Sequence, residues 1–126
     1  MTVLDAAAVL ALVHGEPGAD DVAAAVESAA MCAANLSEVI TKLIDADLDA
    51  SRVRQLLSAA GVNIGPLTEG DAELAGAMRS LPGGRGLSLG DRCCLALTAR
   101  STPSEVLTAD RAWSQPDLPI RVRLIR

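Results

Sequence analysis

Four carboxylates in this sequence stand where strand-like and helical segments meet. Asp5 in TVLD and Asp110 in VLTAD come directly after short apolar segments that are typical of buried strands. Glu38 in NLSEV lies one turn into a helical segment, and Asp91 in LSLGD lies at the start of another. Ligands bind at the carboxyl ends of the strands in a parallel sheet, so we expect these acids to meet at one edge.

Carboxylates that share one cleft repel each other, so they must either take up protons or bind a cation. Neither histidine nor cysteine accompanies these acids, and a ligand set of oxygen atoms alone favours Mg²⁺ or Mn²⁺ over zinc. Such an ion lowers the pKa of a bound water, which then serves as a nucleophile on a phosphodiester. The only histidine, His14, is expected at the surface or at a helix end.

Helix capping is the competing explanation for each acid taken alone. Asp5 and Asp110 are suited to the N-cap position, where a carboxylate accepts a free backbone N–H. The spacing of a capping box recurs in Asn35-x-x-Glu38 and Ser88-x-x-Asp91. The same spacing in Thr68-x-x-Asp71, which we interpret as a plain cap, shows that one motif by itself is weak support for a metal site.

Apolar runs alternate with helical patterns along the whole chain. Strands are predicted at residues 2–4, 31–33, 62–64, 105–107 and 120–125. Helices are predicted at residues 6–13, 20–29, 36–46, 50–60, 72–81, 89–100 and 111–115. Strands separated by helices indicate an α/β fold: one three-layer α/β/α domain over residues 1–126, with a central parallel sheet of about five short strands.

Composition narrows the possible classes of protein. Half of the 126 residues are apolar and 21% are charged, as in a globular domain, and no apolar run reaches the roughly 18–20 residues that cross a bilayer. The start of the sequence has no signal-peptide pattern, so we expect a cytoplasmic protein without a membrane contact. Three cysteines without a CxxC pair indicate buried thiols.

Charge is unevenly distributed between the two halves of the sequence. Residues 1–75 hold twelve acids and three basic residues, whereas residues 76–126 hold eight arginines and four acids. The second half is therefore suited to contacts with phosphates, although arginines on solvated helix faces explain the pattern equally well. With no Phe or Tyr and a single Trp, the chain lacks a platform for stacking bases.

Taken together, the segments that carry the four acids resemble the PIN-domain ribonucleases, and specifically the VapC toxins of bacterial toxin–antitoxin pairs. The resemblance runs in order through nearly the whole chain, in the following stretches: TVLDAAAVLALVHGEPGAD, NLSEVITKL, GLSLGDRCCLALT, VLTADRAW and IRVRLI. VLDAAAVLAL and LSLGDRCCLALT are its most specific parts. The resemblance implies a PIN-domain fold and an endoribonuclease that depends on Mg²⁺ or Mn²⁺.

The resemblance also implies roles for individual residues. Asp5 and Asp91 would be the central metal ligands, Glu38 would orient water and metal, and Asp110 would complete the site. Thr108 matches the small polar residue beside the last acid. It would either make a hydrogen bond that supports the site or form part of a turn.

Other residues near the acids have two possible roles each. Asn35 and Ser88 precede two of the acids and would either support them or cap a helix. Arg92 and Arg111 directly follow acids and would either contact RNA phosphates or form salt bridges.

The family resemblance implies partners as well. Members are typically homodimers that cleave RNA, and a VapB-type antitoxin inhibits them by covering the acidic cleft. The alternative is a non-catalytic PIN-like module for binding or dimerisation, in which the acids only cap helices. Other α/β classes fit less well. A phosphotransfer receiver needs paired acids after its first strand and a haloacid-dehalogenase-type phosphatase needs DxD there, and Asp5-Ala6-Ala7 matches neither. The glycine-rich loops that bind nucleotides are also missing.

Overall fold

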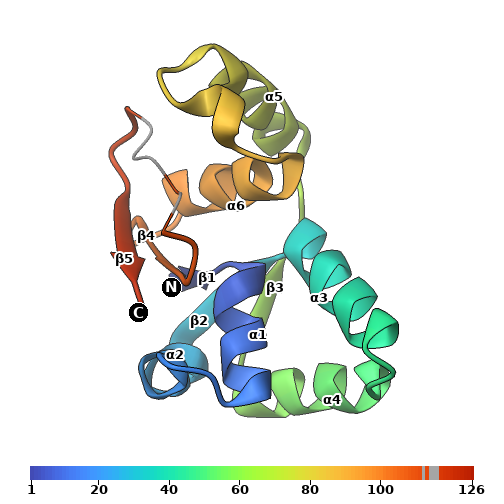
Figure 1. Ribbon diagram of the computed structural model, residues 1–126. Coiled ribbons are helices and arrows are strands. Elements are labelled where there is room, and N and C mark those ends of the chain that lie inside the picture. Colours follow the sequence, from blue (N-terminus) through green and yellow to red (C-terminus); the bar gives the residue numbers. More distant parts are fainter. Residues whose placement is uncertain (112, 114–116) are drawn as a thin grey trace.

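A five-stranded parallel sheet forms the centre of the computed structural model, which describes residues 1–111, 113 and 117–126 (Figure 1). The strands lie in the order β3-β2-β1-β4-β5, and all four neighbouring pairs are parallel. Their bounds are β1 Thr2–Leu4, β2 Ala29–Cys32, β3 Asn63–Gly65, β4 Glu105–Thr108 and β5 Arg121–Leu124. The predicted parallel sheet of five short strands is therefore confirmed.

Helices cover both faces of this sheet. They are α1 Ala6–His14, α2 Ala19–Ala25, α3 Ala33–Asp45, α4 Ala50–Ala60, α5 Glu69–Ala77 and α6 Leu89–Ala99, with 3₁₀ turns at Val26–Ser28, Met78–Ser80 and Gly84–Gly86. Figure 1 shows α5 and α6 on one side of the strands and α1, α2 and α4 on the other. This three-layer α/β/α arrangement agrees with the sequence prediction.

Alternating side chains along the strands build two separate cores. Leu4, Met31 and Leu107 point to one face, where they pack against helices α1 to α4. Their strand neighbours Val3 and Val106 point to the other face and pack against α5 and α6. This period-two alternation between two covered faces explains why the strands are apolar along their whole length.

Strands are added first on one side of β1 and then, from β4 onward, on its other side. From β1 it proceeds to β2 and β3 on one side, and β4 and β5 extend the sheet on the other side. The backbone N–H of Asp5 continues this central pairing by donating to the Leu107 carbonyl at 3.2 Å. Adjacent strands whose connections leave in opposite directions open a crevice at their carboxyl ends, which is where α/β proteins bind ligands.

Several predicted boundaries were wrong by a few residues. The helix predicted at 36–46 begins at Ala33, because β2 is held by β1 and β3 up to Cys32 and passes directly into α3. The helix predicted at 20–29 ends at Ala25, and a 3₁₀ turn leads into β2, which starts at Ala29. The helix predicted at 72–81 starts earlier, at Glu69, where its capping box places it. Most of the short helix predicted at 111–115 lies outside the described residues.

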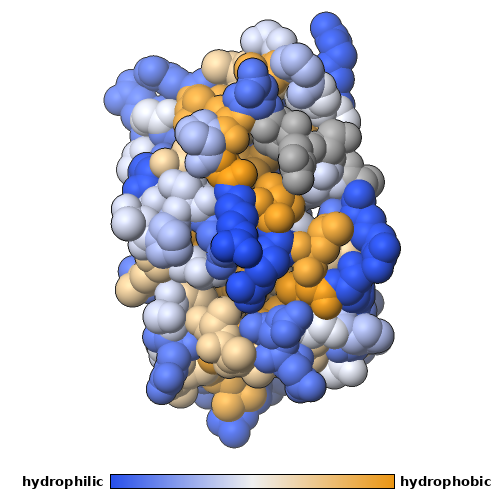
Figure 2. All heavy atoms as spheres, turned by 90° about the vertical axis from the view of Figure 1, so that its left-hand side faces the viewer, coloured by the Kyte–Doolittle hydropathy of each residue, from blue (hydrophilic) through white to orange (hydrophobic). Residues whose placement is uncertain are grey.

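β5 forms one edge of the sheet and carries arginines. The carboxylate of Glu105 on β4 lies 3.5 Å from Arg121 Nε and 3.7 Å from Arg123 Nη1. Figure 2 faces this edge and shows hydrophilic side chains across the middle of the face, beside apolar ones. Charged side chains on an edge strand discourage the addition of further strands from other molecules.

All three cysteines are buried and unbonded, as the sequence predicts. In the part of the chain that the structure describes, none of the helices combines the length and the apolar character that a membrane span requires.

An ion pair joins the two helices on the α5/α6 face. Arg100 follows α6 and donates from Nε and Nη2 to the two carboxylate oxygens of Asp71, at 2.9 and 3.0 Å. Asp71 closes a capping box with Thr68 at the start of α5, as predicted. The Arg100 guanidinium is the main reason that the pKa of Asp71 lies below its usual value, so this carboxylate stabilises the fold while it is ionised.

We therefore predict that Arg100→Ala lowers the free energy of unfolding at pH 7 by about 1 kcal/mol, a modest value because the guanidinium is half exposed. The difference from the parent protein should shrink as the pH falls below about 4, where Asp71 takes up a proton and the ion pair is lost. Urea unfolding at several pH values measures this. Arg79→Ala, at an exposed site, is the control, and an equal loss in both variants would contradict the role of the pair.

Candidate active site

All four predicted acids line one cleft at the carboxyl ends of the central strands. The cleft has a volume of about 150 Å³. Its walls are formed by Asp5, Ala6, Ala7, Leu10, Asn35, Glu38, Lys42, Asp91 and Asp110. Segments more than 100 residues apart in the sequence thus meet at the crevice between β1 and β4.

Asp5 is both a helix cap and a wall of the cleft. It is the N-cap of α1, and its Oδ1 accepts the Ala8 backbone N–H at 2.7 Å. Its other oxygen, Oδ2, accepts the hydroxyl of Thr108. With only 5% of its surface exposed, the carboxylate is fixed between α1 and β4. Capping and cleft formation, which the sequence presented as alternatives, are therefore combined in one side chain.

The pKa of Asp5 is raised from 3.8 to about 6, chiefly because burial penalises the charged form. The hydrogen bonds from Thr108 and Ala8 act in the opposite direction, and the negative charges of Asp91 and Asp110 raise the pKa further. A cation in the cleft would reverse both unfavourable effects, because it would replace the lost hydration and cancel the repulsion.

Thr108 joins the first and last acids. Its buried hydroxyl donates to Asp5 and accepts the backbone N–H of Asp110 at 3.0 Å. The supporting hydrogen bond that the sequence predicted for Thr108 is therefore present. Asp110 itself is exposed and lies just beyond β4, with its position set by this hydroxyl.

Glu38 reaches the cleft from the second turn of α3. Asn35, on the preceding turn, donates from Nδ2 to Glu38 Oε1 at 2.8 Å and to the Gly90 carbonyl at 3.1 Å. The prediction that Asn35 caps a helix and begins a capping box was wrong, because Cys32 is the N-cap of α3 and Asn35 lies inside the helix. Its amide instead supports the acid, which was the other predicted role.

Asp91 sits in the first turn of α6 and has two functions, as Asp5 does. Ser88 is the N-cap of α6; its hydroxyl accepts the Asp91 N–H at 3.1 Å, and Asp91 Oδ2 accepts the Ser88 N–H at 2.9 Å. The predicted capping box is therefore confirmed, while the same carboxylate also lines the cleft. Because α1, α3 and α6 all begin at the cleft, the positive ends of their dipoles favour negative charge there.

Lys42 is a cleft residue to which the sequence analysis assigned no function. It follows Glu38 by four residues, which places both side chains on one face of α3. Among the described residues that line the cleft, it is the only cationic one. Its helical spacing from Glu38 is the signal that would have found it.

The two arginines that follow acids have different surroundings. Arg92 turns to α5, where Nη1 donates to the Ala75 carbonyl at 2.9 Å, so its guanidinium joins two helices. This hydrogen bond is neither of the roles that the sequence predicted for Arg92, and an RNA contact by it stays an untested prediction. Arg111 is exposed directly after Asp110 and is not among the described residues that line the cleft.

The cleft offers the oxygen donors that Mg²⁺ and Mn²⁺ prefer. Within the described part of the chain, no three acidic, histidine or cysteine side chains are already grouped closely enough to enclose an ion. Mg²⁺ usually retains several waters and takes only one or two carboxylates directly, so it needs fewer protein ligands than an enclosed metal centre does. Asp91 and Asp110 contribute to the raised pKa of Asp5, so both of these acids lie within electrostatic reach of it.

The buried charge of Asp5 leads to a prediction on stability. Folding raises the pKa of Asp5 from 3.8 to about 6. Below about pH 4 the carboxyl group is protonated in both the folded and the unfolded state and costs no stability. As the pH rises through about 6 the buried group must ionise, and the free energy of unfolding falls. We expect Asp5→Asn, which can still cap α1, to raise the free energy of unfolding in EDTA at pH 8 by up to about 3 kcal/mol. The gain should vanish near pH 4 in urea unfolding, and equal stabilities at pH 8 would contradict it.

Comparisons with known proteins agree with the fold. A toxin–antitoxin complex from Klebsiella pneumoniae contains a chain with 23% identity and a TM-score of 0.77, covering 100% of this chain and 98% of that one. VapBC2 from Rickettsia felis, bound to a DNA fragment from its promoter, contains a chain with 11% identity and a TM-score of 0.70, covering 98% and 97%.

At these identities the two structures show a shared fold. No curated protein matches the sequence. The family model described as PIN domain matches residues 2–118, nearly the full length, and so confirms the resemblance seen in the sequence. The chain belongs to the PIN domain family.

Proposed function

We propose that this chain, as one domain over residues 1–126, is a metal-dependent endoribonuclease and the VapC-type toxin of a type II toxin–antitoxin pair. The observation that carries the proposal is the meeting of Asp5, Glu38, Asp91 and Asp110 in one cleft. PIN domains are generally nucleases that use divalent metal ions, which supports hydrolysis of nucleic acids. RNA as the substrate and Mg²⁺ or Mn²⁺ as the ion are our proposals.

Each acid has a proposed role that follows from its surroundings. Asp5 and Asp91 would hold the ion directly, since their backbones are fixed at the starts of α1 and α6. Glu38, held by Asn35, would orient water, and Asp110 would complete the site. When bound, the ion would lower the pKa of a water and so supply the nucleophile for the phosphodiester.

The proposed RNA contacts use the cations around the cleft. An acidic cleft repels a polyanion, so a bound phosphate needs positive charge nearby. Lys42 lines the cleft, and Arg111 is exposed beside Asp110. We assign both to the phosphates that flank the cleavage site.

The proposed partners are a VapB-type antitoxin and a second copy of the chain, in the cytoplasm. The two structural neighbours come from toxin–antitoxin systems, which supports the first of these. A segment that covers this cleft would need a basic side chain to meet its acids. The gene product encoded next to this chain is the first candidate for such an antitoxin.

A matched pair of variants tests the metal site. Asp91 and Asp71 both close capping boxes at the start of helices, but only Asp91 lines the cleft. We expect Asp91→Asn and Asp5→Asn to weaken Mn²⁺ binding at least tenfold, and Asp71→Asn to leave it unchanged although it removes an ion pair. Calorimetric Mn²⁺ titration measures this. Equal affinities in all variants would favour the non-catalytic module.

Activity is tested on a structured RNA. We expect cleavage that requires Mn²⁺ or Mg²⁺, stops in EDTA and falls by a factor of 10² or more in Asp5→Ala, because the site then loses a central ligand. Circular dichroism of Asp5→Ala shows whether the protein remains folded. Cleavage that continues in EDTA would contradict the mechanism.

A further inference from the structure

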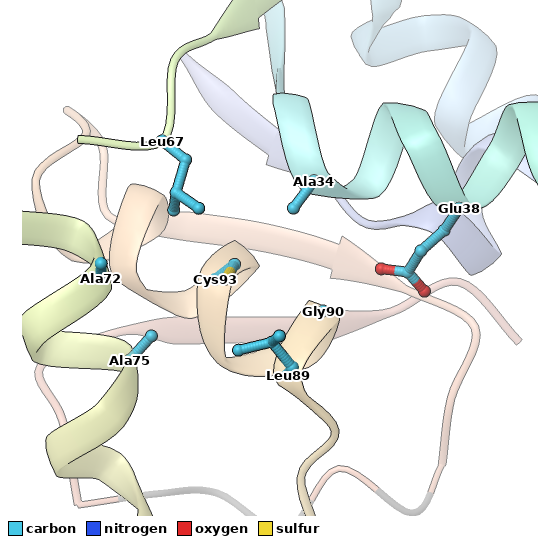
Figure 3. Close-up of a pocket in the computed structure, with 8 residues that line it drawn as sticks. All are labelled: Ala34, Glu38, Leu67, Ala72, Ala75, Leu89, Gly90 and Cys93. Carbon is cyan, nitrogen blue, oxygen red and sulfur yellow. The ribbon is translucent and has the colours of Figure 1, made fainter. Parts of the chain in front are cut away.

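The carboxylate of Glu38 occupies space that a side chain at position 90 would fill. Figure 3 shows Glu38 extending from α3 toward the first turn of α6, where Gly90 lies. A Cβ atom placed on Gly90 would lie 1.9 Å from Glu38 Oε1 and 2.7 Å from Cδ. Both distances are shorter than the 3.0 Å below which Cβ atoms essentially never approach other atoms, so Glu38 keeps this position only because residue 90 has no side chain.

Asn35 holds the same carboxylate from the other side. Its amide group is buried and donates to both Glu38 Oε1 and the Gly90 carbonyl. One amide therefore fixes the acid to the start of α6, at the point where the missing side chain leaves room. The two contacts are made by the nitrogen, and the buried Oδ1 of Asn35 has no hydrogen-bond partner among the described residues.

Helix formation does not explain a glycine at this position. Gly90 lies in the first turn of α6, and its backbone is in the ordinary helical region, where alanine is the better helix former. A glycine here lowers helix stability, and no turn at this position needs its conformational freedom. The close approach of Glu38 is the feature that requires it.

We propose that Gly90 and Asn35 are positioning residues that hold the Glu38 carboxylate in the cleft beside the turn that carries Asp91. This inference rests on the proposed function, in which Glu38 orients water and metal and therefore has to be held in the cleft. Gly90 supplies the space and Asn35 supplies the hydrogen bond, and both act through the carboxylate of Glu38.

Gly90→Ala tests the proposal, with Gly76→Ala as the matched control. Gly76 is also helical, in α5, and a Cβ there meets no atom within 4 Å. Both changes favour the helix, and the group that Gly90→Ala displaces is the end of a flexible, partly exposed side chain, so we expect both variants to remain folded. We expect Gly90→Ala to weaken Mn²⁺ binding and RNA cleavage by about 10-fold to 100-fold, as losses of supporting residues around metal sites do, and Gly76→Ala to change neither.

A second set of variants shows whether Gly90 acts through Glu38. In a Glu38→Gln background, Gly90→Ala should add almost nothing to the loss of Mn²⁺ affinity, because the carboxylate that it displaces is already absent. If the loss of Mn²⁺ affinity in the double variant equals the product of the two single losses, the proposal is overturned. So would unchanged Mn²⁺ affinity in Gly90→Ala.

The position of Glu38 can also be followed without metal. In isotope-labelled protein, Gly90→Ala should shift the carboxyl ¹³C resonance of Glu38 and the side-chain amide resonances of Asn35, and Gly76→Ala should move neither. Unmoved resonances in Gly90→Ala would overturn the positioning role. A parent protein that binds no Mn²⁺ while Gly90→Ala still shifts these resonances would refute the proposed function and leave the positioning of Glu38 supported.

Discussion

Negative charge packed against the ends of the two central strands is the constraint on which this structure depends. Asp5 is buried at the end of β1, and the repulsion of Asp91 and Asp110 adds to the cost of keeping it ionised. A fold selected only for stability would place an apolar or neutral residue there. The molecule instead supports the carboxylate with a helix N-terminus, a backbone N–H and a threonine hydroxyl. These contacts reduce the cost without removing it.

The order of the strands in the sheet brings these acids together. Because β1 and β4 are neighbours while the chain continues from them toward opposite sides of the sheet, the residues after them are brought together from opposite ends of the sequence. The helices α3 and α6 then begin at the same edge and add Glu38 and Asp91. Each acid is attached to a different element, so the geometry of the cleft depends on how well the sheet and its helices pack.

Much of the fold was predictable because its signals are local. Short apolar runs separated by helical patterns gave the parallel sheet and three layers, and the four acids could be placed at its edge from strand ends alone. Boundaries failed where tertiary pairing overrides local preference, as at Ala33, where the paired strand β2 passes straight into α3. Lys42 could have been placed in the cleft from its helical spacing to Glu38. The role of Gly90 depends on a distance between α3 and α6, which spacing along the chain does not encode.

The double use of Asp5 and Asp91 affects how related sequences should be interpreted. Each of these acids also holds the first turn of a helix, so a homologue without nuclease activity would still gain stability by retaining Asp91 as a cap. Glu38 lies beyond the first turn of α3 and caps nothing. In a set of diverging homologues, the loss of Glu38 or the appearance of a side chain at Gly90 would therefore be an earlier sign of a pseudoenzyme than the loss of either capping aspartate.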